Sequence, residues 1–107
     1  MSCSDCVTEV DTCMTHGTTY TQDVELLQGY EDYASLGYQG RFSVLDYEGG
    51  PTLKSVVADI DLENFLSFTL TPDETEALPP YDLFYTVDLF TPTDVQRIYQ
   101  GSVTMNL

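Results

Sequence analysis

Basic residues are almost absent from this sequence. Its 107 residues include eighteen acidic side chains but only three basic ones, which gives a formal net charge of −15. A surface of this kind repels nucleic-acid phosphates and anionic membrane lipids. We therefore expect neither nucleic acid nor a membrane as a partner. The charge fits a solvated surface, a partner that carries basic patches, or a high-salt setting that screens the self-repulsion.

The sequence also lacks tryptophan, long apolar runs and a second histidine. No apolar stretch approaches the roughly 18 residues that span a bilayer. Residues 1–6 have neither the basic region nor the apolar segment of a signal peptide, so we expect the protein to be made in a cytoplasm. A single histidine and the lack of a glycine-rich phosphate loop give little basis for catalysis. We therefore expect a protein that is not an enzyme.

Segments of alternating apolar and polar residues are the main structural signal. This period of two is typical of half-buried strands, and the length allows one domain with a single core. The regular spacing of the segments is typical of a sandwich or an open barrel. We predict an all-β fold, an antiparallel β-sandwich of about six or seven strands, over residues 18–107. The expected strands cover 18–27, 38–47, 53–59, 62–70, 81–90 and 95–105.

One short helical turn is expected near 72–78. Thr71 suits a helix N-cap, Pro72 suits the first helical position, and Glu74 lies three residues after the cap, which together form a capping box. Pro79 and Pro80 then end the helix, because proline cannot continue it.

The last two predicted strands should form an antiparallel hairpin around the turn at 91–94. The apolar phase of the second strand slips between Ile98 and Val103. We interpret Gly101 as the bulge that absorbs this slip. Two strands alone are marginal in water, so the earlier strands are expected to cover the apolar face of the hairpin.

Residues 1–17 are expected to form an extended N-terminal arm, because they contain few large apolar residues. Two closely spaced ligand pairs lie in this segment, and together they suit one structural Zn²⁺. Two other interpretations remain open: the cysteines form disulfides, or they stay free and inert. The candidate metal ligands are Cys3, Cys6, Cys13 and His16.

Carboxylates and tyrosines offer two weaker candidate sites. Asp59, Asp61 and Glu63 share one face of an extended segment and could bind Ca²⁺, although they lack the spacing of a known calcium loop. We interpret them as a solvated strand edge. Tyrosine is favoured at protein interfaces, and some of the eight tyrosines are expected to pack in the core or across strands instead. The tyrosines expected in the core or in cross-strand packing are Tyr81, Tyr85 and Tyr99, and the expected partner-binding ones are Tyr30, Tyr33 and Tyr38.

The order of these segments resembles a small β-sandwich found in tailed-phage virion proteins. The resemblance is carried by the strand at 40–46, the strand-to-helix segment at 68–78, the tyrosine-bearing strand at 85–89 and the strand at 98–105. The N-terminal domain of baseplate upper proteins is the most similar family we can name. The resemblance implies a structural role in the virion without catalysis, and assembly with other virion proteins in a homo-oligomer or a symmetric array.

Three functions follow as expectations. The first is a head decoration or cement protein that binds neighbouring capsid subunits. The second is a tail, baseplate or fibre-attachment adaptor. The third, from another class, is a soluble zinc-bearing adaptor or inhibitor that acts inside the host cell. The first two place the protein in the virion, and the third places it in the host cytoplasm.

Overall fold

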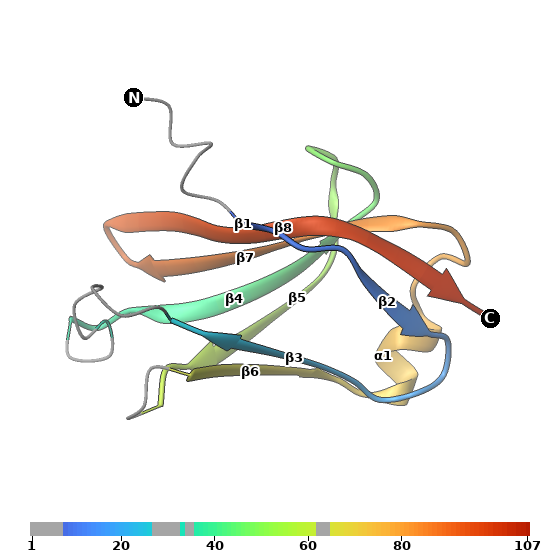
Figure 1. The fold of residues 1–107 in the computed structure, drawn as a ribbon, viewed down its shortest axis with the longest axis horizontal. Helices are drawn as coiled ribbons and strands as arrows, with labels where there is room; N and C mark the ends of the chain where they lie inside the picture. The colour runs from blue at the N-terminus through green and yellow to red at the C-terminus, as the bar shows by residue number, and fades with distance from the viewer. Residues whose placement is uncertain (1–7, 27–32, 34–35, 62–64) are drawn as a thin grey trace.

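The computed structural model describes residues 8–26, 33, 36–61 and 65–107. Within these residues the chain forms strands and one short helix, arranged as two packed sheets (Figure 1). The larger sheet has the strand order β1-β8-β7-β4-β5, with β2 also paired to β8, and the smaller sheet pairs β3 with β6. The predicted all-β sandwich is confirmed. The elements are β1 (Thr8–Glu9), β2 (Thr12–Thr15), β3 (Tyr20–Glu25), β4 (Gln39–Leu45), β5 (Thr52–Asp59), β6 (Phe65–Leu70), α1 (Pro72–Glu76), β7 (Leu83–Thr91) and β8 (Asp94–Asn106).

All six predicted strands are present, and so is the predicted helix. The Thr71 side chain accepts a hydrogen bond from the backbone N–H of Glu74, and the Glu74 carboxylate accepts one from the backbone N–H of Thr71. This capping box confirms the sequence interpretation. Within the described residues, no helix is long and apolar enough to span a bilayer.

The segment expected to be an arm differs from the prediction. β1 and β2 pair in parallel with β8, and the side chain of Met14 in β2 is buried in the core. Residues 8–15 therefore belong to the larger sheet, which makes the sandwich mixed rather than purely antiparallel at this edge. Residues 1–7, the rest of the expected arm, lie outside the described part of the chain.

The β7–β8 hairpin is antiparallel as predicted, but its bulge lies elsewhere. The register shifts between Val87 and Asp88, whose partners are Tyr99 and Arg97, so Ile98 is the extra residue. Gly101 keeps its register with Tyr85 and has a different role. A Cβ atom at Gly101 would overlap the backbone carbonyl of Val10, so only glycine lets the chain between β1 and β2 lie against β8.

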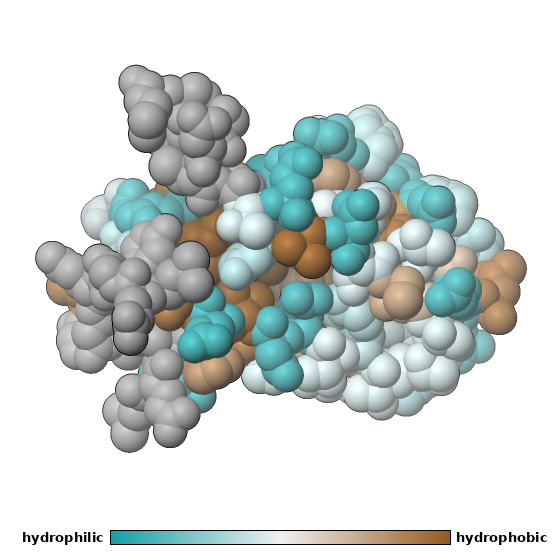
Figure 2. Space-filling view, in the orientation of Figure 1, coloured by the Kyte–Doolittle hydropathy of each residue, from teal (hydrophilic) through white to brown (hydrophobic). Residues whose placement is uncertain are grey.

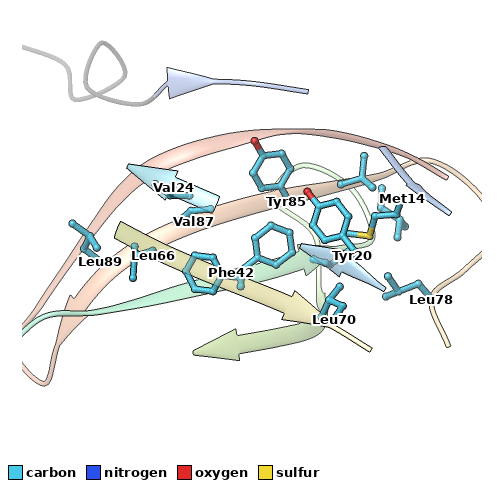
Figure 3. Close-up of a cluster of buried hydrophobic side chains, with 14 of the residues drawn as sticks. Met14, Tyr20, Val24, Phe42, Leu66, Leu70, Leu78, Tyr85, Val87 and Leu89 are labelled. Carbon is cyan, nitrogen blue, oxygen red and sulfur yellow. The ribbon is translucent and has the colours of Figure 1, made fainter. Parts of the chain in front are cut away.

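The core fills the space between the two sheets, where side chains from both converge (Figure 3). Phe42 lies at its centre, stacked on Tyr85 with ring centroids 5.4 Å apart, and its ring also packs near those of Phe68 and Tyr20 at 5.8 and 5.9 Å. Burying aromatic rings of this size is a major source of stability. A Cβ atom at Gly40 would meet the side chains of β6, so the even-numbered residues of β4 face the smaller sheet.

Candidate functional site

The opposite side of the larger sheet, which we call the outer face, carries the odd-numbered residues of β4 and their cross-strand neighbours. The registers of β5, β4, β7 and β8 arrange these neighbours in rows, because directly opposed residues share one face of a sheet. The central row contains Val57, Arg41, Asp88 and Arg97, flanked on one side by Asp59, Gln39, Phe90 and Val95 and on the other by Ser55, Ser43, Thr86 and Gln100.

An ion cluster lies in the central row, and we call it the Arg–Asp–Arg cluster. Asp88 accepts a hydrogen bond from Nε of Arg97 at 3.0 Å and one from Nη2 of Arg41 at 3.4 Å. The Asp88 side chain is only 4% exposed, whereas the side chains of Arg41 and Arg97 are 36% and 47% exposed. A buried carboxylate is costly unless it is paired, and here two guanidinium groups pair with one carboxylate. The cluster therefore has a net positive charge.

Apolar side chains surround the cluster. The guanidinium of Arg41 lies over the ring of Phe90, 5.0 Å from its centroid, which is a cation–π arrangement. Val57 and Val95 are 51% and 59% exposed on the same face. Elsewhere, the side of the molecule seen in Figure 2 is mostly hydrophilic or intermediate, with small separate apolar patches.

A hollow of about 250 Å³ opens on this face. Its walls combine the charged cluster with hydroxyl groups, and the hydroxyls of Ser43 and Ser55 lie 3.4 Å apart. Ser43 and Thr86 are buried despite being on the outer face. The residues that line the hollow are Arg41, Ser43, Leu45, Thr52, Ser55, Thr86, Asp88 and Arg97.

The charge of the outer face differs from that of the rest of the chain. On β5, β4, β7 and β8, the three rows described above carry two arginines and two aspartates, Asp59 and Asp88, so this central part of the face is neutral. It is bordered on β1 by Glu9, which pairs with Gln100 and accepts a hydrogen bond from its side chain. The remaining sixteen acidic residues are opposed only by Lys54, so the net charge of −15 lies entirely outside these rows. Lys54 itself pairs with Glu74, beside the helix.

The structure describes only half of the predicted zinc site. Cys13 is a free, exposed thiol on β2, and Cys3 and Cys6 lie outside the described residues. His16 follows β2 directly, and its Nε2–H donates a hydrogen bond to the carbonyl oxygen of Leu78 at 2.7 Å. This bond leaves Nδ1 as the nitrogen that could bind a metal.

Cys13 and His16 lie in different local structures. Cys13 belongs to β2, whereas His16 lies in the turn that follows, and its ring is bonded to the carbonyl oxygen of Leu78. The backbone N–H of His16 donates a hydrogen bond to the carbonyl oxygen of Asn106 on β8. Within the described residues, no three His, Cys, Asp or Glu side chains form a metal-ligand group. The four-ligand zinc site therefore stays a prediction.

The predicted partner-binding tyrosines occupy different environments. Tyr33 is 9% exposed and belongs to the core cluster, so it offers little surface to a partner. Tyr38 is half-buried, packs edge-on against Tyr33 with centroids 5.0 Å apart, and donates a hydrogen bond to Asp94. This hydrogen bond is the main cause that lowers the pKa of Asp94. Tyr30 lies outside the described residues.

Of the tyrosines expected in the core or in cross-strand packing, Tyr85 is fully buried and Tyr99 packs against the core cluster. Tyr81 is not a core residue. Tyr81 precedes β7, is 51% exposed, and donates a hydrogen bond to the carboxylate of Asp46. This bond is the main cause that raises the pKa of Tyr81.

The carboxylates considered for Ca²⁺ have local partners where the structure describes them. Asp59 accepts a hydrogen bond from the side chain of Gln39, and Asp61 accepts one from the backbone N–H of Phe65. Asp59 is exposed at the end of the edge strand β5, in keeping with the solvated edge that we expected. Glu63 lies outside the described residues.

Sequence reasoning missed the Arg–Asp–Arg cluster. Its members lie on three strands, and only the register between those strands brings them together. One signal was available. Asp88 is an acidic residue inside a strand rich in aromatic and β-branched residues, and two of the three basic residues lie in other predicted strands. A charge in such a strand needs a paired charge when it is buried.

No protein-family model matches the sequence, and no curated protein matches it.

Proposed function

We propose that this protein is a non-enzymatic structural subunit of a tailed-phage particle, and specifically a head decoration or cement protein. Its outer face docks on a neighbouring subunit. The segments that resemble phage virion sandwiches fall in β4, in β6 with α1, in β7 and in β8. These elements supply the centre of the larger sheet and one strand of the smaller sheet. The resemblance therefore covers the framework of the fold.

The observation that carries the proposal is the neutral central part of the outer face, on a strongly acidic molecule. Protein interfaces are depleted in acidic residues and enriched in arginine and aromatic residues at their centre. The three rows of the outer face fit this description, because they contain Arg41, Arg97 and Phe90 together with the exposed Val57 and Val95. A face without net charge can approach another protein with less repulsion than the acidic remainder of the surface.

The acidic remainder supports a place at the surface of a larger assembly. Its charge is attracted to basic patches on capsid subunits and speeds their association. Symmetric copies around a capsid junction would keep their acidic sides apart and their neutral faces in contact with the lattice. The same docking face serves the alternative role, in which the protein holds another component on the tail or baseplate.

Quantitative mass spectrometry of purified particles tests the proposal. The particles come from the phage that encodes the chain, and the major capsid protein is the internal copy-number standard. We expect the protein in the particle, at hundreds of copies if it decorates the head and at a few dozen or fewer if it belongs to the tail. Its absence from particles, together with its presence in the infected cell, would contradict the proposal and favour the soluble zinc-bearing adaptor or inhibitor.

A further inference from the structure

The hollow on the outer face has the chemistry of an anion site. The Arg–Asp–Arg cluster supplies two guanidinium groups and one carboxylate, so one positive charge is left without a partner inside the cluster. A guanidinium has five N–H donors. The bonds to Asp88 use Nη2 of Arg41 and Nε of Arg97, so further donors remain on both partly exposed side chains.

The arginines are held in place before any ligand arrives. Asp88 is buried and fixes both of them from below, while the ring of Phe90 supports the guanidinium of Arg41. Less side-chain freedom is then lost when a ligand binds, which favours affinity. The hydroxyls of Ser43 and Ser55 line the same hollow and add neutral hydrogen-bonding groups.

We propose that this hollow binds a single carboxylate group, held by Arg41 and Arg97. Guanidinium groups match the planar, two-oxygen geometry of a carboxylate. One unbalanced positive charge suits a singly charged group better than a doubly charged phosphate, especially on a chain with a net charge of −15. The hollow, at about 250 Å³, has room for a small acid or for the end of an aspartate or glutamate side chain.

The carboxylate can come from two sources, a free small acid or an acidic side chain of another polypeptide. In the second case the hollow would be the specific point of a docking face, because it would accept an acidic side chain that the rest of this acidic surface repels. The inference concerns the isolated chain and does not depend on its presence in a virus particle.

Titration of the isotope-labelled protein by NMR tests the site. Acetate and a short glutamate-containing peptide are added separately at constant ionic strength, with chloride as the reference anion. We expect saturable shifts of the Nε–Hε signals of Arg41 and Arg97 and of the Ser43 and Thr86 amides. Saturation by acetate would support a site open to free acids, whereas saturation by the peptide alone would support a polypeptide-borne carboxylate.

Three variants make the test specific. Arg97→Gln should weaken binding roughly tenfold, because it removes a charge-assisted hydrogen bond. Lys54→Gln removes the same charge beside the helix and should leave binding unchanged. If Arg97→Gln fails to give a folded spectrum, Arg41→Gln takes its place.

The proposal is overturned if neither ligand saturates, or if chloride produces the same shifts. It is also overturned if the Arg97 and Lys54 variants lose affinity equally, since the effect would then come from net charge rather than from the hollow.

Discussion

At the scale of single residues, Gly101 decides whether the N-terminal strands can pair with β8. The backbone carbonyl of Val10 occupies the space that a side chain at this position would need. The hydroxyl of Tyr85 donates a hydrogen bond to the same carbonyl from the core side. The chain between β1 and β2 is therefore held in two ways: its backbone lies directly against Gly101, and it accepts a hydrogen bond from Tyr85.

Gly101→Ala should destabilise the protein by about 1–3 kcal/mol, because a rigid backbone atom cannot move aside as a flexible side chain can. Gly50→Ala is the matched control. Its Cβ would meet only the ring of Tyr47, which is 61% exposed and can turn away. Urea unfolding of both variants measures the difference, and equal stabilities would show that the approach of Val10 to Gly101 is not tight.

The raised pKa of the Tyr85 hydroxyl predicts that the protein loses stability at alkaline pH. Burial, the largest cause, raises the pKa of its hydroxyl from 10.0 to about 12. The folded protein keeps a proton that the unfolded chain releases near pH 10, so this stabilisation is complete below about pH 10 and is lost as pH rises towards 12.

The measurement is the free energy of unfolding across this alkaline range for the wild type and for Tyr85→Phe. The variant also loses the hydrogen bond to Val10, so it should be less stable at neutral pH by about 1 kcal/mol. Its stability should then fall less steeply as pH rises. Parallel pH profiles would contradict the assignment to Tyr85.

At the scale of elements, β2 is the strand that most changes the expected organisation of the chain. Met14 is 2% exposed, whereas its neighbours Cys13 and Thr15 are exposed. Figure 3 places Met14 beside Tyr20 and near Leu78, and Figure 1 shows β2 and α1 at the same end of the fold. Residues 12–15 therefore close one end of the core.

Met14→Ala should cost about 2–5 kcal/mol of stability, the range for a large side chain removed from a core. Thr15→Ala, one residue along on the exposed side, should change stability by less than about 0.5 kcal/mol. Denaturant unfolding measures both. A small effect for both variants would indicate that β2 is an arm that lies loosely on the sheet.

The segment 3–16 also carries the zinc prediction. Metal analysis of protein purified without chelator should find about one Zn²⁺ per chain if the four ligands form a structural site. Cys13→Ala should then lose the metal, and Cys13→Ser serves as a second variant of nearly equal size. Less than about a tenth of an equivalent in the wild type would rule the site out, since structural zinc binds tightly.

The sequence predicted the strands with a clear period of two and the helix with a capping box, because local residue patterns set both. It did not predict β1 and β2, since Thr8, Thr12 and Thr15 give little apolar signal and Met14 alone faces the core. Their parallel pairing depends on the edge of β8, a distant element. The bulge at Ile98 was missed because Gly101 offered a simpler local explanation of the phase slip.

At the scale of the whole molecule, charge divides the surface. The central rows of the outer face are neutral, and the rest of the chain carries the entire net charge of −15. The neutral rows suit close contact with another protein, and the acidic rest of the surface keeps copies of this chain apart in solution. Sequence composition revealed the charge but not its distribution, because the distribution depends on strand register.

A cryo-EM map of the intact particle tests the docking of the outer face most directly. The account predicts density for the two-sheet sandwich with Arg41, Arg97 and Phe90 facing an adjacent subunit, and with the acidic remainder turned to solvent or to basic patches. A map in which this sandwich is present but its outer face points to open solvent, or in which no such density exists, would contradict the account.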